Sequence, residues 1–264
     1  MQLDICFRNL RDKRRALIGW CIGLAVLTLF TMAFWPTIKG TPQYDRLLRR
    51  LPDTLKAFVG NQPLTTPQGY LQTELFLYLV PLLFMIYAIG RGADAIAGEE
   101  ERKTMDLLLS TPVSRRRVVL EKYTATVLGM GLLALVLVVT LYVTAALFNM
   151  NIGLAELVAA TIGAALLSLA FAAVALAVSS SAAKRGLAIA TASALATAAF
   201  FLNSLAPLAD SLKAFQKFSP FYWYLGHSPL TNGFDFKGLA LLVAVAAVMV
   251  ATAVARFERR DVSV

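Results

Sequence analysis

Apolar residues are gathered along this chain into long runs, and most charged residues fall between the runs. A helix rises about 1.5 Å per residue, so crossing the hydrocarbon core of a bilayer takes about 20 apolar residues. The pattern therefore predicts an all-α polytopic membrane protein, a single transmembrane domain over residues 1–264. Six transmembrane helices are expected at about 17–35, 70–90, 124–148, 152–178, 187–206 and 238–255.

The segment at 39–69 is too long for a simple turn, and its apolar residues recur three and four positions apart. That spacing places them on one face of a helix. We expect an amphipathic helix in the outer membrane interface, kinked or restarted at Pro52. Its apolar face would consist of Tyr44, Leu47, Leu48, Leu51, Leu55 and Phe58.

The segment at 207–237 combines three prolines with a cluster of aromatic residues. Prolines at this spacing exclude one straight helix. Aromatic side chains gather at the depth of the lipid headgroups. We therefore expect a short re-entrant or interfacial hairpin before the last span, with Phe215, Phe218, Phe221, Tyr222, Trp223 and Tyr224.

Positive charge is distributed unequally between the two sides of the predicted spans. With the N-terminus inside, 17 of the 25 Lys and Arg residues fall inside and 8 outside. Cytoplasmic loops carry such an excess, so both termini and the segment at 91–122 are expected in the cytoplasm. The net charge of +9 then sets topology and attracts membrane lipids. No soluble basic patch interleaved with aromatic residues indicates nucleic acid as a partner.

The last three spans are rich in alanine, glycine and serine. Small side chains allow helix backbones to approach each other closely in a membrane. Packing within one subunit explains this composition. A subunit interface or the wall of a conduit would explain it too.

Chemically reactive groups are scarce in the predicted spans. Glu74 and Glu156, near the outer ends of two spans, are the ionisable residues there, which argues against self-contained ion coupling. The single histidine, His227, cannot form a two-histidine metal site, and its neighbour Ser228 is poorly placed for a hydrolytic pair. No phosphate-binding loop of the form GxxxxGK[ST] occurs. We therefore expect no catalytic activity, no cofactor and no metal, and intramembrane hydrolysis is disfavoured.

A dense charged segment, 98–122, lies between the second and third predicted spans. We expect Asp94 to start a short helix with three consecutive glutamates early in it, where the helix dipole favours acids. Pro112 would end that helix, and Ser114 would cap the next one. A solvated charge run between two spans is one explanation. A helix that docks on a soluble partner is the other.

Several stretches together carry a family resemblance. The central one reads AGEEE at 97–101, TMDLLLSTPVSR at 104–115, and then Lys122. Others are LPDTLKAFVG at 51–60, FSPFY at 218–222 and FERRD at 257–261. Together they resemble the membrane subunit of type-2 ABC exporters, six-span permeases that pair with a separate ATPase. The likeness departs at Lys103, where the family usually has glycine.

The resemblance implies a permease homodimer that binds two copies of an ABC ATPase subunit. It implies that the loop at 91–122 is the coupling helix that contacts the ATPase. The contact residues would be Glu99, Glu100, Glu101, Thr104, Leu107, Leu108 and Pro112. It also implies an interfacial connecting helix before the first span, with Phe7, Arg11, Arg14 and Arg15.

The expected function is ATP-driven export of a hydrophobic or amphipathic compound, such as a drug, antibiotic, peptide or lipid. ATP hydrolysis would take place in the partner, and the permease would lie in a prokaryotic plasma membrane. The alternative is a membrane scaffold without transport that anchors and regulates an ATPase.

Overall fold

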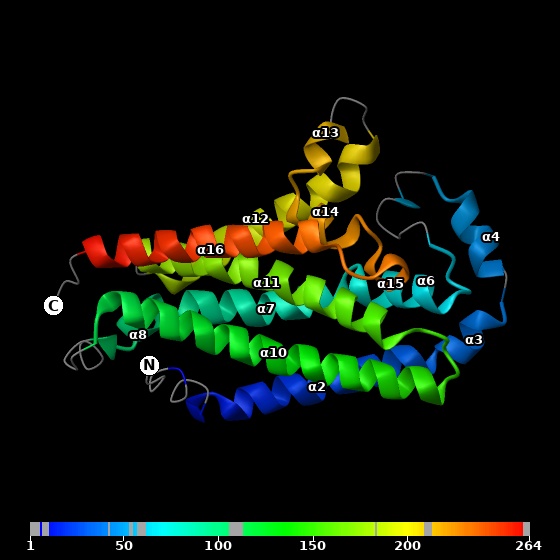
Figure 1. Ribbon diagram of the computed structural model, residues 1–264, viewed down its shortest axis with the longest axis horizontal. Coiled ribbons are helices and arrows are strands. Elements are labelled where there is room, and N and C mark those ends of the chain that lie inside the picture. Colours follow the sequence, from blue (N-terminus) through cyan, green and yellow to red (C-terminus); the bar gives the residue numbers. More distant parts are fainter. Residues whose placement is uncertain are drawn as a thin grey trace.

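Six long helices run side by side in the computed structural model, which describes residues 6, 11–41, 43–52, 55–56, 62–105, 113–182, 184–208 and 213–260 (Figure 1). No strand occurs within these ranges. Each of the six is long and apolar enough to cross a membrane. They are Arg14–Lys39, Pro67–Asp94, Arg115–Leu147, Leu154–Ala182, Arg185–Leu208 and Phe236–Arg259. The predicted all-α membrane fold and its six spans are confirmed.

Several spans are built from more than one helical element. The first joins α2 (Arg14–Ala33) to α3 (Trp35–Lys39), and the break lies just before Pro36, which has no amide donor. The second joins α6 (Pro67–Leu71), the π-helical turn η1 (Gln72–Phe76) and α7 (Leu79–Asp94). The other four are α10 (Arg115–Leu147), α11 (Leu154–Ala182), α12 (Arg185–Leu205) with η2 (Ala206–Leu208), and α16 (Phe236–Arg259).

The helices extend beyond the predicted spans chiefly at one end of the bundle. The third span, for example, begins at Arg115 instead of residue 124 because Ser114 caps it: the hydroxyl of Ser114 accepts the amide of Arg117 at 3.4 Å. The predicted Ser114 cap is therefore confirmed. Apolar run length marks the part of a helix that lies in hydrocarbon, whereas charged residues continue the same helix into water.

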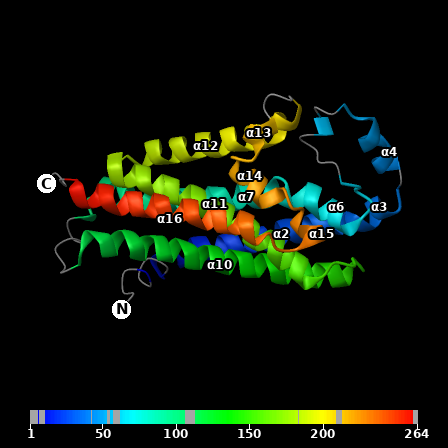
Figure 2. The same cartoon turned by 45° about the horizontal axis from the view of Figure 1, so that its top comes forward.

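Helix α11 lies at the centre of the bundle and packs against α7, α10, α12 and α16 (Figures 1 and 2). Most of its small residues are buried, including Gly163, Ala164, Ser168 and Ala172. Short side chains let four neighbouring helices approach one central helix. For this span, packing within one subunit therefore accounts for the small-residue pattern.

Two glycines mark the closest approaches between spans. A Cβ atom added at Gly92 of α7 would overlap the backbone carbonyl of Ala172 in α11. A Cβ atom added at Gly129 of α10 would overlap the hydroxyl of Tyr87 in α7. These contacts fix the position of α7 between its two neighbours.

The end of the bundle where the first span ends and the second begins carries short helices. α4 (Gln43–Arg50) confirms a helix in the segment at 39–69; it ends before Pro52, and Tyr44 and Leu47 are exposed on it. The expected continuation through Phe58 falls mostly outside the described residues.

The described residues of the segment at 207–237 include three short helices: α13 (Lys213–Gln216), α14 (Pro220–Leu225) and α15 (Pro229–Asn232). As its prolines predicted, the segment is not one straight helix. Its aromatic residues divide into two groups. Phe215 and Phe218 are exposed, whereas Phe221 and Tyr224 are buried against the spans. The Tyr224 hydroxyl donates to the carbonyl of Phe76 at 2.9 Å, so part of the expected aromatic belt instead anchors the hairpin to the second span.

The packing of α7 yields a matched test with two glycines one half-turn apart. Gly92→Ala should destabilise the protein by about 1 to 3 kcal/mol, because the methyl group overlaps backbone that cannot rotate away. Gly90→Ala meets nothing within 4 Å and should stabilise α7 by up to about 1 kcal/mol. Thermal unfolding of the two variants in detergent measures the difference. Equal melting temperatures would contradict the close contact between α7 and α11.

Candidate functional site

Figures 1 and 2 show one end of the bundle at which α2, α10 and α12 begin and α7, α11 and α16 end. Charged residues concentrate in the sequence at this end. We call this the charged end. The short helix α8 (Ala97–Glu101) lies there, directly after α7. The predicted coupling residues belong to this helix and to the segment that follows it.

Asp94 is the hub of the charged end. Its carboxylate forms ion pairs with Lys13, with Arg102 at 3.0 Å and with Arg185 at 3.6 Å. The three cations come from the segment before α2, from the end of α8 and from the start of α12. Because a largely buried carboxylate needs compensating charge, these pairs hold three segments around the end of α7.

The expectation that Asp94 starts a helix is wrong. α7 continues through Asp94, and α8 begins at Ala97 after the capping position Ile96. A local capping pattern suggested that role, but the carboxylate pairs with Arg102 and with two cations far away in sequence, Lys13 and Arg185. The side chain therefore stabilises tertiary structure instead of a helix start.

Glu99 links α8 to the third span. It forms an ion pair with Lys122 of α10, which is only 5% exposed, and it accepts a hydrogen bond from the hydroxyl of Thr104. Burial alone would raise the pKa of Glu99, but the bonds from Lys122 and Thr104 outweigh it and lower the pKa below its ordinary value. The carboxylate thus stabilises the fold above its ordinary pKa, and this contribution is lost as pH falls through the lowered value.

Glu100 links α8 to the last span. Its two carboxylate oxygens accept from the guanidinium of Arg260 at 2.8 and 3.1 Å, a bidentate pair. Arg115 donates to the carbonyl of Phe257 at 3.2 Å and to the carbonyl of Arg260, and it lies over the Phe257 ring. The end of α16 is therefore fastened both to α8 and to the start of α10.

Glu101 links α8 to the fifth span. Its carboxylate accepts the backbone amide of Arg185, at the first residue of α12, at 3.0 Å. The side chain of Arg185 pairs with Asp94. The start of α12 is consequently held by one acid at the end of α7 and by another at the end of α8.

A backbone contact joins α8 to the central helix as well. The amide of Ala97 donates to the hydroxyl of Ser179 in α11 at 2.8 Å, and that hydroxyl donates to the carbonyl of Ala93 at 2.9 Å. Ser179 thereby bridges the last turn of α7 and the first turn of α8. Through these contacts α8 is attached to five of the six spans.

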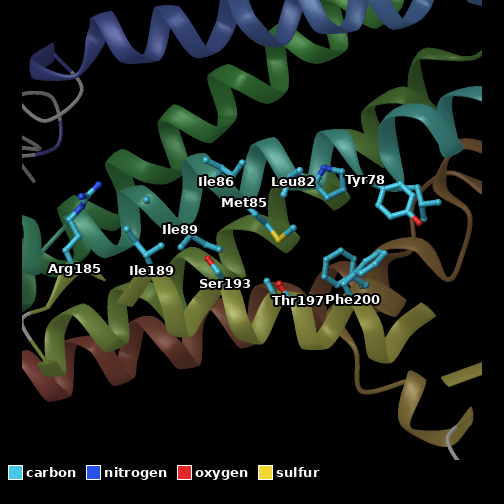
Figure 3. Close-up of a pocket in the computed structure, with 15 residues that line it drawn as sticks. Tyr78, Leu82, Met85, Ile86, Ile89, Arg185, Ile189, Ser193, Thr197 and Phe200 are labelled. Atoms are coloured by element: carbon cyan, nitrogen blue, oxygen red, sulfur yellow. The ribbon is translucent and has the colours of Figure 1, made fainter. Parts of the chain in front are cut away.

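An apolar groove of about 470 Å³ runs between α7 and α12 (Figure 3). Leu82, Met85 and Ile189 line its middle, together with the hydroxyl groups of Ser193 and Thr197. At the end of the groove away from α8 the rings of Tyr78 and Phe200 lie 5.5 Å apart. Arg185 lines the groove at the charged end. The contacts of Arg185 with Asp94 and Glu101 therefore lie where the groove meets α8.

A family model described as ABC-2 family transporter protein matches residues 3–262. This chain belongs to the ABC-2 transporter family. It is accordingly a multi-pass membrane permease of an ABC transporter, and its family implies association with an ABC ATPase subunit. The resemblance seen in the sequence motifs is confirmed. No curated protein matched the chain.

The permease brings together only some of the residues predicted for its site. Glu99, Glu100 and Glu101 lie on α8, and Thr104 lies just beyond its end. The carboxylates of Glu99 and Glu100 contact cations of the chain itself, and that of Glu101 accepts a backbone amide. Arg11 is exposed, and so are Arg14 and Arg15, which form the first turn of α2. Four further predicted residues lie outside the described part of the chain, namely Phe7, Leu107, Leu108 and Pro112.

Sequence reasoning missed the partners of the acidic residues. Lys13, Arg185 and Arg260 lie 81, 84 and 160 residues from the acids that they contact. No periodic pattern relates positions so far apart. The only signal available was that these basic residues fall at the ends of spans on the same predicted side as the acidic loop.

Lys103 takes a backbone conformation that glycine adopts without strain. Its φ is 56°, in the left-handed region, which costs an L-residue with a side chain about 1–2 kcal/mol. The left-handed residue turns the chain so that the Thr104 amide donates to the carbonyl of Glu99 at 2.9 Å. The turn that closes α8 thus places the Thr104 hydroxyl against Glu99.

Lys103→Gly should therefore raise the stability of the permease by up to about 1 kcal/mol, because the relief of strain exceeds the added flexibility of the unfolded chain. Lys103→Val should lower it by more than about 1 kcal/mol, since a β-branched residue is disfavoured in this region. Melting temperatures in detergent compare the two. A valine variant as stable as the glycine variant would contradict the left-handed turn.

Proposed function

We propose that this permease exports a hydrophobic or amphipathic compound, driven by ATP hydrolysis in its ABC ATPase partner, and that it has no catalytic activity of its own. One observation carries the proposal. α8, in the segment that resembles a coupling helix, contacts both α7 and α12, the two walls of an apolar groove. A force applied to α8 would act directly on the end of that groove.

The contacts of α8 suggest how the force would spread. Glu101 and Asp94 hold the start of α12, Glu99 holds α10, and Glu100 holds α16. When the ATPase subunits close on ATP, a shift of α8 would move the end of α12 relative to α7. The groove would then open toward one side of the membrane and close toward the other.

The docking surface for the ATPase would lie mainly in the segment that follows α8. The carboxylates of Glu99, Glu100 and Glu101 are engaged within the chain. By family resemblance Thr104, Leu107, Leu108 and Pro112 remain contact residues. In this division of roles, the segment after α8 receives the force and the acids transmit it to the spans.

A second copy of the permease would pack against α12. One face of this helix exposes Gly186, Ala190, Ala194 and Ala198, which recur every fourth residue. Small residues at that spacing let two membrane helices approach closely. The face lies beside the groove residues Arg185, Ile189, Ser193 and Thr197 on the same helix. A homodimer formed here, with one ATPase per protomer, would bring two grooves together near its axis.

The chemistry of the groove supports the class of cargo. Its wall is almost entirely aliphatic and aromatic, so a long apolar body would be buried there. Two hydroxyls and one arginine could orient a polar group. A drug, antibiotic, peptide or lipid of amphipathic character fits this surface. The excess of Lys and Arg at the charged end supports an orientation in which that end faces the cytoplasm. The proposed location is a prokaryotic plasma membrane.

The pair of Glu100 and Arg260 offers a test that separates transmission from docking. Glu100→Arg should lower substrate-stimulated ATP hydrolysis by about tenfold, because a charged hydrogen bond contributes about 1.5 kcal/mol. Glu100→Arg combined with Arg260→Glu should restore most of the rate, since the pair is reformed with its charges exchanged. The measurement is ATPase activity of the reconstituted complex with and without amphiphiles.

Arg259→Glu in place of Arg260→Glu is the matched control, because Arg259 is exposed and forms no ion pair among the described residues. This combination should stay uncoupled. A double variant with Arg260→Glu that remains as slow as Glu100→Arg alone would contradict the transmission role. An ATPase rate that no amphiphile changes, even in the wild type, would instead favour a scaffold without transport.

A further inference from the structure

A second groove, of about 610 Å³, lies between α10, α11 and α16. In Figure 1 α11 is seen between α16 and α10, and in this groove Leu166 and Leu169 of α11 form the floor. It shares no lining residue with the groove between α7 and α12. The proposed transport path does not use it.

The shape of this groove matches a lipid chain. Along α16 it extends from Val243 to Glu258, which at about 1.5 Å per residue is about 22 Å. One leaflet of the hydrocarbon core is about 15 Å thick. Every α16 residue in the groove before Glu258 is an alanine or a valine, so an extended acyl chain would meet an apolar surface along its whole length.

The charged end of the groove has one cation and one anion on opposite walls. Arg116 comes from α10 and Glu258 from α16. Both side chains are exposed, and neither forms an ion pair with any described residue. The two groups are therefore available to a ligand that carries both signs of charge.

The three consecutive arginines at the start of α10 have different partners. Arg115 caps the end of α16 through two carbonyls, and Arg117 pairs with buried Glu121 at 2.5 Å. Arg116 alone of the three lines the groove. A cation at a helix start is disfavoured by the helix dipole, so an anion bound at Arg116 would offset that cost. A phosphate group suits a guanidinium because it can accept two hydrogen bonds.

We propose that this groove binds a zwitterionic phospholipid whose headgroup ends in a primary ammonium, of the phosphatidylethanolamine type. The phosphate would contact Arg116, the ammonium would donate to Glu258, and one acyl chain would lie along α16 over Leu166 and Leu169. An anionic headgroup without an amine would leave Glu258 unpaired beside negative charge. A choline headgroup could not donate a hydrogen bond to it.

Native mass spectrometry of the purified permease can test this with dioleoyl phosphatidylethanolamine, phosphatidylglycerol and phosphatidylcholine. Phosphatidylethanolamine should bind about tenfold more tightly than the other two, as expected for one additional charged hydrogen bond. Arg116→Gln should weaken all three lipids. Glu258→Gln should remove the preference for phosphatidylethanolamine over phosphatidylcholine. It should also strengthen the binding of phosphatidylglycerol, whose anionic headgroup no longer meets the negative charge of Glu258.

Arg256→Gln is the matched control, since Arg256 is an exposed arginine of α16 that does not line this groove, and its lipid binding should equal that of the wild type. Ala247→Trp should fill the groove and expel the bound lipid without changing the oligomeric state. Equal affinities for the three lipids, or normal binding by Arg116→Gln, would overturn the proposal. Loss of a dimer in Ala247→Trp would assign the groove to a second copy and overturn it as well. Because Arg116 and Glu258 are exposed, their variants remain informative if the tryptophan variant does not fold.

Discussion

The carboxylate of Asp94 is the interaction on which the arrangement of the charged end depends. It sits at the last residue of α7 with three cations around it, from the segment before α2, from the end of α8 and from the start of α12. Because the carboxylate is largely buried, the loss of any one cation raises the free-energy cost of keeping its negative charge buried. The ends of three segments therefore tend to move with α7 as one unit.

The acidic residues of α8 extend this unit to the rest of the bundle. Glu99, Glu100 and Glu101 each take a partner from a different span, and Ser179 ties the same helix to α11. In the sequence these acidic side chains suggest either a solvated charge run or a docking helix; in the fold their carboxylates bind partners within the chain. This arrangement suits a helix that must transmit a displacement, since a helix attached only by its chain ends would bend instead.

The sequence was sufficient for the spans but not for the charged end. Run length predicted six helices, and the prolines at 207, 220 and 229 excluded one straight helix before the last span. The predicted helix cap at Ser114 is confirmed, and the one predicted at Asp94 is wrong. A local capping pattern holds no information about cations more than 80 residues away. No pattern in the sequence predicted the groove between α7 and α12, since it depends on how two separate spans pack.

The central claim is that α8 moves the walls of the α7–α12 groove through Asp94 and Glu101. The most direct measurement is the distance between spin labels at residues 86 and 189, on opposite walls, by pulsed electron resonance in the complex with its ATPase. We predict that trapping the ATP-bound state changes this distance in the wild type but not in a variant with Asp94→Asn and Glu101→Ala. The same change in both proteins would contradict the account.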